Sequence, residues 1–436
     1  MPLPAGPTTP PAVQTIRWIY RPISFMQAAR RKYGEAFSVN FAGFSAPMVM
    51  VSDPDLVKTV YSNPANSLPA SRVALLEPTL GKKSVILLDG KEHLARRKLM
   101  LPAFHGERMR SYESVMEEAI DREIESWPVG VPFPIHTRMQ SVTLEVILRA
   151  VFGVTDSDRL IRLRELLGKT LEDTASLGLQ LVTIIGRRFG RDVAPPSFKA
   201  TLAQVDAELA GLIEEVRRDP NLGERDDILS MMASAEFADG TRMDDGELRD
   251  QLMTLLLAGH ETTATALAWT FDLLLRSPDR LARLTDEVKE GGDEYLRATI
   301  TESLRLRPVI PIAGRILDED IEVDGIRLSA GDNVAPSMWM AHTRADSFPD
   351  PLAFKPERFL EDPPETYSWI PYGGGVRRCL GAAFAEFEMR VVLTEVLTRC
   401  EIELADKSPQ RVGRRNITFS PKQGTPVVMT SREPRR

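Results

Sequence analysis

The stretch Tyr372-Gly-Gly-Gly-Val-Arg-Arg-Cys-Leu-Gly381 encloses one of the two cysteines of this chain between glycines and paired arginines. Glycines allow tight turns and close approach of the backbone to a bound group, and a thiolate is a common metal ligand. The pattern therefore predicts a metal-thiolate loop. A glycine-rich turn before a helix, with Cys379 as a small buried hydrophobic residue, fits the same letters. The stretch alone leaves both interpretations open.

The composition is that of an ordinary folded protein. Of 436 residues, 43% are hydrophobic and 27% are charged, which provides enough apolar material for a large core and an internal cavity. The net charge of -7 gives no general footprint for nucleic acid, so we predict no nucleic-acid partner. The length alone favours about three domains, but no repeat or low-complexity linker divides the chain. We predict a single domain over residues 1–436.

The amino-terminal segment does not resemble a secretory signal. It has no positive charge before Arg17 and no long apolar run, and its many prolines predict a poorly ordered segment over residues 1–15. No run of about 18 apolar residues occurs, so no membrane anchor is predicted. Because only Cys379 and Cys400 are available for a disulfide, we expect both to be reduced and the protein to be cytoplasmic.

Helical periodicity dominates the rest of the chain. Residues 37–51 alternate as in a hairpin, and Asp53-Pro54 is typical of a helix start. Apolar residues then recur at helical spacing from about residue 87 to 260. Asp324-Gly325 predicts a second hairpin between residues 321–323 and 326–328. The sequence therefore predicts a mainly α fold with a smaller β-rich region.

One predicted helix is much longer than the others. It begins at a capping box formed by Asp244 and Glu247 and ends at Arg276, before Ser277-Pro278. At the helical rise it would be about 48 Å long, enough to cross a whole domain. Because it is apolar on most sides, we expect it to be central and buried.

The sequence Ala258-Gly-His-Glu-Thr-Thr263 lies inside this long helix. Gly259 weakens a helix and threonines can bond back to carbonyls, so we expect a bend. Glu261 either pairs with a basic residue or takes part in a proton relay with Thr262. His260 is expected to be structural, since no second histidine stands at metal-ligand spacing from it.

Two charged motifs are weak on their own. His93 and Arg97 share one helix face, which fits an anion clamp or a solvated charged face. Glu302 and Arg305 stand one turn apart in a helix that Pro308 must end, and exposed pairs of this kind contribute only about 0.2 to 0.5 kcal/mol. Pro356-Glu-Arg-Phe359 follows in an irregular stretch.

In this order and spacing, the acid-threonine helix, Glu302-Ser-Leu-Arg305, Pro356-Glu-Arg-Phe359 and the cysteine loop resemble the cytochrome P-450 family of haem-thiolate monooxygenases, soluble bacterial members in particular. The resemblance spans nearly the whole chain, and four motifs together are specific. Tyr372 stands where phenylalanine is common in the family, a change that keeps the aromatic ring. The resemblance implies the cytochrome P-450 fold, with a long central helix over a buried haem b.

The resemblance assigns roles on the cysteine side of the haem. Cys379 would be the iron ligand, and its thiolate would donate electron density that favours O–O cleavage. The loop residues expected to approach the porphyrin are Tyr372, Gly373, Gly375 and Gly381. The residues expected to bind the two propionates are His93, Arg97, Arg315 and Arg377. A buried structural charge network is implied for Glu302, Arg305 and Arg358, in which loss of one partner costs about 3 to 5 kcal/mol.

On the opposite side, the resemblance assigns Glu261 and Thr262 to the protonation of bound dioxygen. The pair favours reductive oxygen activation over a peroxide-using peroxygenase, and it argues against a non-catalytic haem or lipid carrier. No flavin or dinucleotide motif is visible, so electrons are expected from a separate ferredoxin or flavodoxin with its reductase. Its docking face would be basic, drawn from Arg96, Lys98, Arg108, Arg110, Arg344 and Arg378.

The substrate is expected to be a lipophilic small molecule such as a terpenoid, steroid or fatty acid. By resemblance, its pocket is lined by the loop 73–88, by Leu255 and Ala258 of the long helix, by Val309 and Ile310 in the stretch 309–313, and by Phe419 in the stretch 417–419. Ala258 is expected to border the haem as well.

Overall fold

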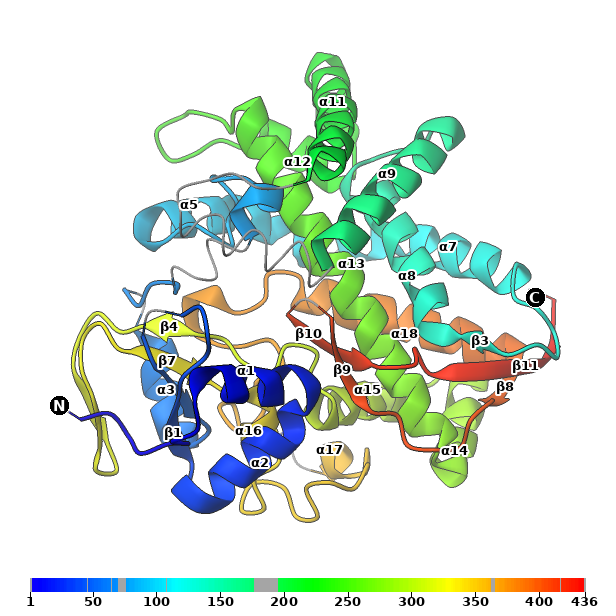
Figure 1. Cartoon of the computed structure of the whole chain (residues 1–436). Helices are drawn as coiled ribbons and strands as arrows, with labels where there is room; N and C mark the ends of the chain where they lie inside the picture. Colours follow the sequence, from blue (N-terminus) through cyan, green and yellow to red (C-terminus); the bar gives the residue numbers. More distant parts are fainter. Residues whose placement is uncertain are drawn as a thin grey trace.

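The structure is a computed structural model that describes residues 2–44, 46–63, 65–69, 76–106, 108–175, 195–361, 365–415 and 417–434. Helices predominate, as predicted, and the small sheets lie among them at both the left and the right of Figure 1. The helices before the central one are α1 (Pro11–Tyr20), α2 (Pro22–Tyr33), α3 (Pro54–Ser62), α5 (Gly90–Met100), η1 (Leu101–Phe104), α6 (Arg108–Ser111), α7 (Glu113–Glu125), α8 (Ile135–Val146), η2 (Ile147–Val151), α9 (Ser157–Ala175), α11 (Pro196–Arg218), η3 (Leu222–Glu224) and α12 (Ile228–Ser234). Those that follow it are α14 (Pro278–Lys289), α15 (Glu294–Leu306), α16 (Met338–His342), α17 (Arg358–Glu361), η4 (Gly375–Arg377) and α18 (Ala382–Arg399).

The central helix is α13 (Asp245–Leu275), which crosses the molecule and packs most extensively on α8 (Figure 1). The predicted capping box is present, with the Asp244 carboxylate accepting from the Glu247 amide at 2.7 Å. The helix continues through Gly259, where an added Cβ would lie 2.9 Å from Cδ1 of Ile147. Glycine at this position therefore lets η2 approach α13 closely.

The largest sheet contains the first predicted hairpin. Strands β1 (Ala36–Val39) and β2 (Met48–Val51) are antiparallel, β7 (Asn333–Pro336) runs parallel to β2, and β4 (Arg315–Ile316) is antiparallel to β7. The helix predicted at Asp53-Pro54 follows as α3, with the Asp53 carboxylate accepting from the amides of Asp55 and Leu56. This sheet therefore joins the start of the chain to the segment after α15.

Three smaller sheets complete the β-rich region. They are β5 (Ile321–Val323) with β6 (Ile326–Leu328), β9 (Val412–Arg415) with β10 (Thr418–Pro421), and β8 (Cys400–Leu404) with β11 (Pro426–Arg432) and β3 (Phe133–Pro134). The predicted Asp324-Gly325 hairpin is confirmed, and both residues have positive φ, at 49° and 78°. Positive φ at both central residues is what a two-residue type I′ turn requires.

The amino-terminal segment, for which poor order is predicted over residues 1–15, makes contacts with the body of the protein. Residues 2–15 are described, and Pro11 already begins α1. Gln14 has a buried side chain, whose amide donates to the carbonyls of Pro7 and Thr9 and accepts from the backbone of Asn40. Gln14 thus ties the proline-rich segment to β1 and its turn, together with the Ser38 amide, which donates to the Ala5 carbonyl. Across the described residues, none of the helices has the length and apolar character needed to traverse a bilayer.

Candidate active site

The cysteine loop, residues 372–381, contains η4 and ends where α18 begins. Two of its glycines are required for different reasons. Gly373 and Gly375 have φ values of 69° and 65°, which side chains rarely adopt. An added Cβ at Gly375 would also lie 1.9 Å from the backbone oxygen of Tyr61 in α3. Gly375 therefore makes room for α3, and not only for a bound group as expected. Gly381 has φ of -93° and free space, so its conformation does not require glycine.

The Cys379 thiol is open to solvent although the protein surrounds it closely. Burial raises the pKa of this thiol, while the Gly381 amide and the charges of Arg97 and Arg378 oppose the shift. The Cys379 amide donates to the Tyr372 carbonyl at 2.9 Å, which fixes the turn. A metal cation would complete the stabilisation of the thiolate. Cys400, in contrast, is buried, and burial raises its pKa to about 11.

The predicted propionate partners form a cationic group near this loop. The Arg377 guanidinium lies 3.5 Å from Nδ1 of His93, and it also donates to Asp89. Arg315 is buried, 5.4 Å above the ring of Tyr61. Burial lowers the pKa of His93, Arg97, Arg315 and Arg377 alike.

This cationic group fits an anionic ligand. In the part of the chain that the structure describes, Asp89 is the carboxylate that bonds to these side chains. Three guanidinium groups with one carboxylate leave an excess of positive charge in a partly buried place, which is unfavourable unless it is balanced. A ligand with two carboxylates and a central metal would balance the cations and the thiolate together. The residues present therefore fit haem.

The middle of α13 is less buried than the rest of the helix. Both flanks of this helix are buried, but Ala258 is exposed and Leu257, Glu261 and Thr262 are partly exposed. The Thr262 hydroxyl donates to the Ala258 carbonyl at 2.5 Å, the backward bond expected from the sequence. A small residue exposed in the centre of an otherwise buried helix indicates an internal space beside it.

Glu261 is turned toward α8 and the β9–β10 hairpin. Its carboxylate accepts from the Gln140 amide at 2.7 Å and lies 3.6 Å from Nε of Arg415 and 3.7 Å from Nε2 of His136. Burial raises the pKa of Glu261, and the Arg415 charge partly opposes this. Burial lowers the pKa of His136 to about 4, so it is neutral near pH 7. Glu261 thus has both a basic neighbour and a chain of polar groups.

Gln140 and His136 were not predicted from the sequence. They lie on a helix without a motif, far from Glu261 along the chain, and only the packing of α8 on α13 brings them together. His260 lies in the same contact between α8 and α13, and its Nδ1 is hydrogen-bonded to the Thr143 hydroxyl at 2.9 Å. Its surroundings agree with the structural role expected of it.

The structure brings Glu302, Arg305 and Arg358 together. Glu302 and Arg305 are fully buried, with Nε of Arg305 at 2.6 Å from the carboxylate, and Arg358 lies 3.3 Å from it. Arg305 also donates to the backbone carbonyls of His342, Pro351 and Ala353. The network therefore fixes the irregular chain that leads to the cysteine loop.

The residues expected to line the substrate pocket divide between two core clusters, although the Phe419 amide donates to the Val309 carbonyl at 2.8 Å. Leu255 and Val309 are nearly buried and belong to the main core around α13. The Phe419 ring packs with Trp18 in the core of the amino-terminal helices and is 3% exposed. Phe419 is therefore a core residue in this structure, and not an exposed pocket wall. Residues 73–75 of the expected loop lie outside the described residues.

Part of the expected basic docking face is already paired. Arg96 donates to Glu247 at 2.6 Å, and Arg344 contacts Asp346. The exposed members are Lys98, Arg108, Arg110 and Arg378. Acidic partners can therefore reach fewer charges than the sequence suggested.

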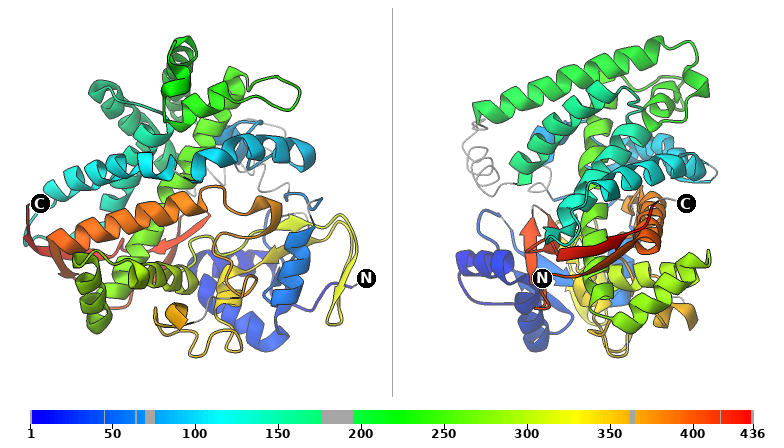
Figure 2. Two further views of the ribbon diagram at one scale, coloured as in Figure 1. Left: turned by 180° about the vertical axis from the view of Figure 1, so that it is seen from behind. Right: turned by 90° about the vertical axis from the view of Figure 1, so that its right-hand side faces the viewer.

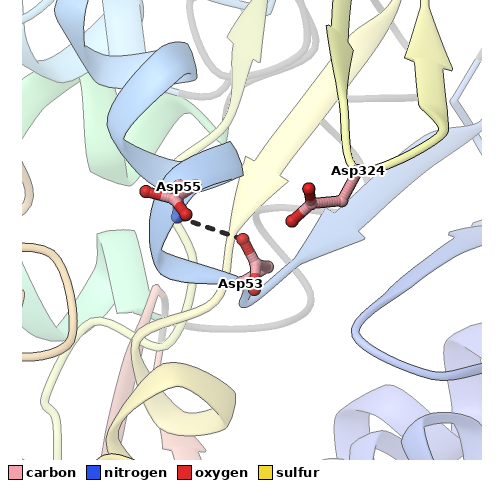
Figure 3. Close-up of side chains that lie close together, drawn as sticks. All are labelled: Asp53, Asp55 and Asp324. Carbon is pink, nitrogen blue, oxygen red and sulfur yellow. Dashed lines mark hydrogen bonds between the residues drawn. The ribbon is translucent and has the colours of Figure 1, made fainter.

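A cluster of three carboxylates lies elsewhere. Asp53, Asp55 and Asp324 bring their oxygens within 4.8 Å of one another (Figure 3). Asp53 is already the cap of α3 and lies 3.4 Å from Arg344. The cluster belongs to the turn between the sheet and α3, and we assign no metal to it.

One buried acid in α18 leads to a prediction about stability. Glu388 is 1% exposed, its Oε1 has no hydrogen-bond partner among the described residues, and burial raises its pKa far above the usual value. The folded protein therefore keeps a proton that the unfolded chain releases above its ordinary pKa. The contribution of Glu388 to the free energy of unfolding is fully present below the ordinary pKa of a glutamate. Above that pKa, and up to the raised pKa of the folded state, it is lost by about 1.4 kcal/mol per pH unit.

Replacing Glu388→Gln should remove this loss. We expect denaturant unfolding at mildly alkaline pH to show a more stable variant, with little difference at acidic pH. Glu401→Gln, at an exposed position of β8, is the matched control and should follow the parent protein. Equal slopes of stability against pH for the parent and Glu388→Gln would contradict the prediction.

Comparison with known proteins agrees with this geometry. A family model described as Cytochrome P-450 matches residues 4–426. Cytochrome P-450 135B1 of Mycobacterium tuberculosis is 38% identical over 98% of this chain and 91% of its own length. Cytochrome P-450 138 of the same organism is 37% identical over 98% of each chain. Among solved structures, retinoic acid-bound cyanobacterial CYP120A1 superposes with a TM-score of 0.84 at 22% identity, covering 99% of this chain and 100% of its own. The haem domain of cytochrome P-450DA gives 0.83 at 22% identity, covering 100% and 98%.

Proposed function

This chain belongs to the cytochrome P-450 family of haem b monooxygenases, which need dioxygen and a redox partner, and on this premise we propose that it oxygenates a lipophilic small molecule in the cytoplasm. The single observation that carries the residue assignment is the open Cys379 thiol beside the cationic group that contains Arg97, Arg315 and Arg377. When bound, haem supplies the iron at which dioxygen is reduced and split. The protein supplies the ligand, the cations and the protons.

The cysteine side holds the cofactor and its charge. Cys379 would bind the iron as a thiolate, helped by the Gly381 amide and by the positive charge of Arg97. His93, Arg97, Arg315 and Arg377 would bind the propionates. Arg377 is held in place by Asp89 and by the Leu88 carbonyl, at 2.6 Å. These contacts preorganise the cations before the ligand arrives.

The α13 side would deliver protons. Glu261 can exchange protons with solvent through a side that is partly exposed, beside Arg415. Gln140 and Arg415 keep the carboxylate oriented, and neutral His136 and the Thr265 hydroxyl, 3.1 Å apart, extend the polar path. The Thr262 hydroxyl, anchored on the Ala258 carbonyl, would hold a water molecule and pass protons from it.

Thr262→Ala is expected to uncouple electron use from product. Without the hydroxyl, electrons should still be consumed while the yield of product per electron falls roughly tenfold or more and hydrogen peroxide rises. Thr270→Ala is the matched control, because Thr270 makes the same backward bond in the same helix, to the Ala266 carbonyl at 2.9 Å. Product, reductant and peroxide measured in one reaction decide the outcome.

The same experiment separates the second candidate function, a peroxygenase. The relay assignment would fail if Thr262→Ala formed as much product per electron as the parent, and if hydrogen peroxide alone supported the full turnover of the parent. A protein that binds haem but forms no product with any reductase would instead point to a carrier.

The lipophilic substrate is supported by the apolar character of the residues that the family resemblance assigns to the pocket, which are Leu255, Ala258, Val309 and Ile310. Binding is observed as the change in haem absorption when the iron-bound water is displaced. A response to terpenoids, steroids or fatty acids is expected. A tight response confined to small ionic compounds would refute this class.

A ferredoxin or flavodoxin is proposed as electron donor, docking on the exposed charges of Lys98, Arg108, Arg110 and Arg378. Lys98 lies on α5, Arg108 and Arg110 lie on α6, and Arg378 lies in the cysteine loop. The loop contacts α5, since Nε2 of His93 lies 3.3 Å from the Val376 carbonyl. Long-range attraction of an acidic partner should make the reduction rate fall as salt rises.

A further inference from the structure

The solvent face of α1 is apolar. Its inward residues are Gln14 and Trp18, while Ile16 is 57% exposed and Tyr20 is 69% exposed. Residues 12, 16 and 20 are one turn apart and share one face, to which Val13 and Ile19 add half-buried edges. An outward helix face in a water-soluble region normally carries polar side chains. The apolar face of α1 therefore has no role in the core of this chain.

A loop extends this face. Phe44, 41% exposed, follows the turn after β1, and the Ala42 amide donates to the Thr15 hydroxyl of α1 at 2.8 Å. The Phe44 ring stands 6.2 Å from that of Phe41, which itself packs on Trp18. Ile16, Tyr20 and Phe44 are thus carried on a fixed base, and we call them the apolar patch.

Positive charge borders the apolar patch. The first 34 residues contain Arg17, Arg21, Arg30, Arg31 and Lys32 and no acidic residue, although the whole chain has a net charge of -7. Arg30 pairs with Glu35, the first acidic residue, but Arg17, Arg21, Arg31 and Lys32 are exposed. The segment is therefore basic and apolar on one surface while the remainder of the protein is acidic.

We propose that α1 and the Phe44 loop adsorb to the surface of a bilayer that contains anionic lipids. An interfacial helix places apolar side chains at the acyl boundary and basic side chains at the headgroups. At 10 residues, α1 is about 15 Å long, and the hydrocarbon core is about 30 Å thick, so it would lie in the surface and not span it. Figures 1 and 2 place α1 and α2 at the periphery, where they can meet a flat surface.

Charge complementarity favours lipid over a second copy of this chain. A second copy would present the same basic surface to itself, and the like charges would repel. An acidic protein would complement the charge of the arginines. It would give no reason for the outward position of the three apolar side chains of the apolar patch. A bilayer with anionic headgroups satisfies both parts of the surface.

The position of α1 also suggests what adsorption would do for the enzyme, and this inference rests on the proposed function. The ring of Trp18 lies 5.7 Å from that of Phe419, and the Phe419 amide donates to the carbonyl of Val309. One layer of side chains therefore separates the apolar patch from the segment proposed to line the pocket. A lipophilic substrate dissolved in the bilayer would be concentrated next to that segment.

The test is vesicle flotation of the haem-loaded full chain. Vesicles made of phosphatidylcholine and phosphatidylglycerol in equal parts should carry the protein upward at low salt, and pure phosphatidylcholine vesicles should carry much less. Ile16→Ser with Tyr20→Ser should weaken binding at least about tenfold. Arg17→Gln with Arg21→Gln should weaken it about fivefold per charge and reduce its salt dependence. Ile161→Ser, at an exposed position of α9 far from α1 in Figure 1, should bind like the parent.

Unchanged far-ultraviolet circular dichroism and haem absorption of the variants would show that they are folded. The proposal is overturned if the parent does not float with anionic vesicles, or if it floats equally well after both double substitutions. It is also overturned if the parent self-associates in sedimentation velocity and Ile16→Ser with Tyr20→Ser restores a monomer, because a second copy would then cover the face. Because flotation needs no substrate, it fails or succeeds independently of the proposed reaction.

Discussion

Replacing Cys379→His is expected to abolish monooxygenation while leaving a folded protein that still contains haem. Imidazole can bind iron, but it is neutral and does not donate electron density as a thiolate does, so splitting of the O–O bond loses its driving force. We expect product formation to fall by more than about a hundredfold, since even a change to a residue behind a metal ligand can cost that much. The absorption spectrum of the reduced carbon monoxide complex should lose its thiolate signature.

The second cysteine provides the control for this result. Cys400→Ser changes a buried thiol at the start of β8, which no motif surrounds and whose pKa burial raises. It should keep both the thiolate spectrum and the activity. If Cys379→His retained the thiolate signature, or if Cys400→Ser lost it, the assignment of the iron ligand would be wrong.

Features encoded by neighbouring residues were predicted well. The capping box of α13, the Asp53 cap of α3 and the Asp324-Gly325 turn each depend on residues within one turn of the chain. Their geometry is decided locally, so the letters determine it. The order of the charged and cysteine motifs similarly predicted the family, which the whole-chain comparisons confirm.

Features that depend on packing between distant segments were not predictable. The need for glycine at position 375 comes from the nearby backbone of Tyr61, and the orientation of the Glu261 carboxylate comes from the amide of Gln140. No sequence motif marks Tyr61 or Gln140. The contacts of residues 2–15 also depend on distant partners, since Gln14 bonds to Asn40 and the Ala5 carbonyl accepts from Ser38. Composition is an average over a segment and gives no sign of such contacts.

Loss of one partner of the Glu302 and Arg305 pair is expected to destabilise the protein more than any surface change. Glu302→Gln leaves the fully buried Arg305 guanidinium without its counter-charge, and also weakens the contacts of that carboxylate with the Lys355 amide and with Arg358. The three backbone carbonyls that Arg305 meets carry only partial charge. We expect the free energy of unfolding to fall by about 3 to 5 kcal/mol.

The same helix contains the matched control for this prediction. Asp293 and Arg297 form a pair one turn apart at the exposed end of α15, with side chains 40% and 59% exposed. Water screens that pair, so Asp293→Asn should cost less than about 1 kcal/mol. Denaturant unfolding of both variants measures the difference directly. If Glu302→Gln and Asp293→Asn lowered the free energy of unfolding by similar amounts, the Glu302–Arg305 pair would contribute no more than an exposed helix pair. A large loss from Glu302→Gln alone would show that the buried charge holds the chain leading to Cys379, because the carbonyls bound by Arg305 lie in that chain.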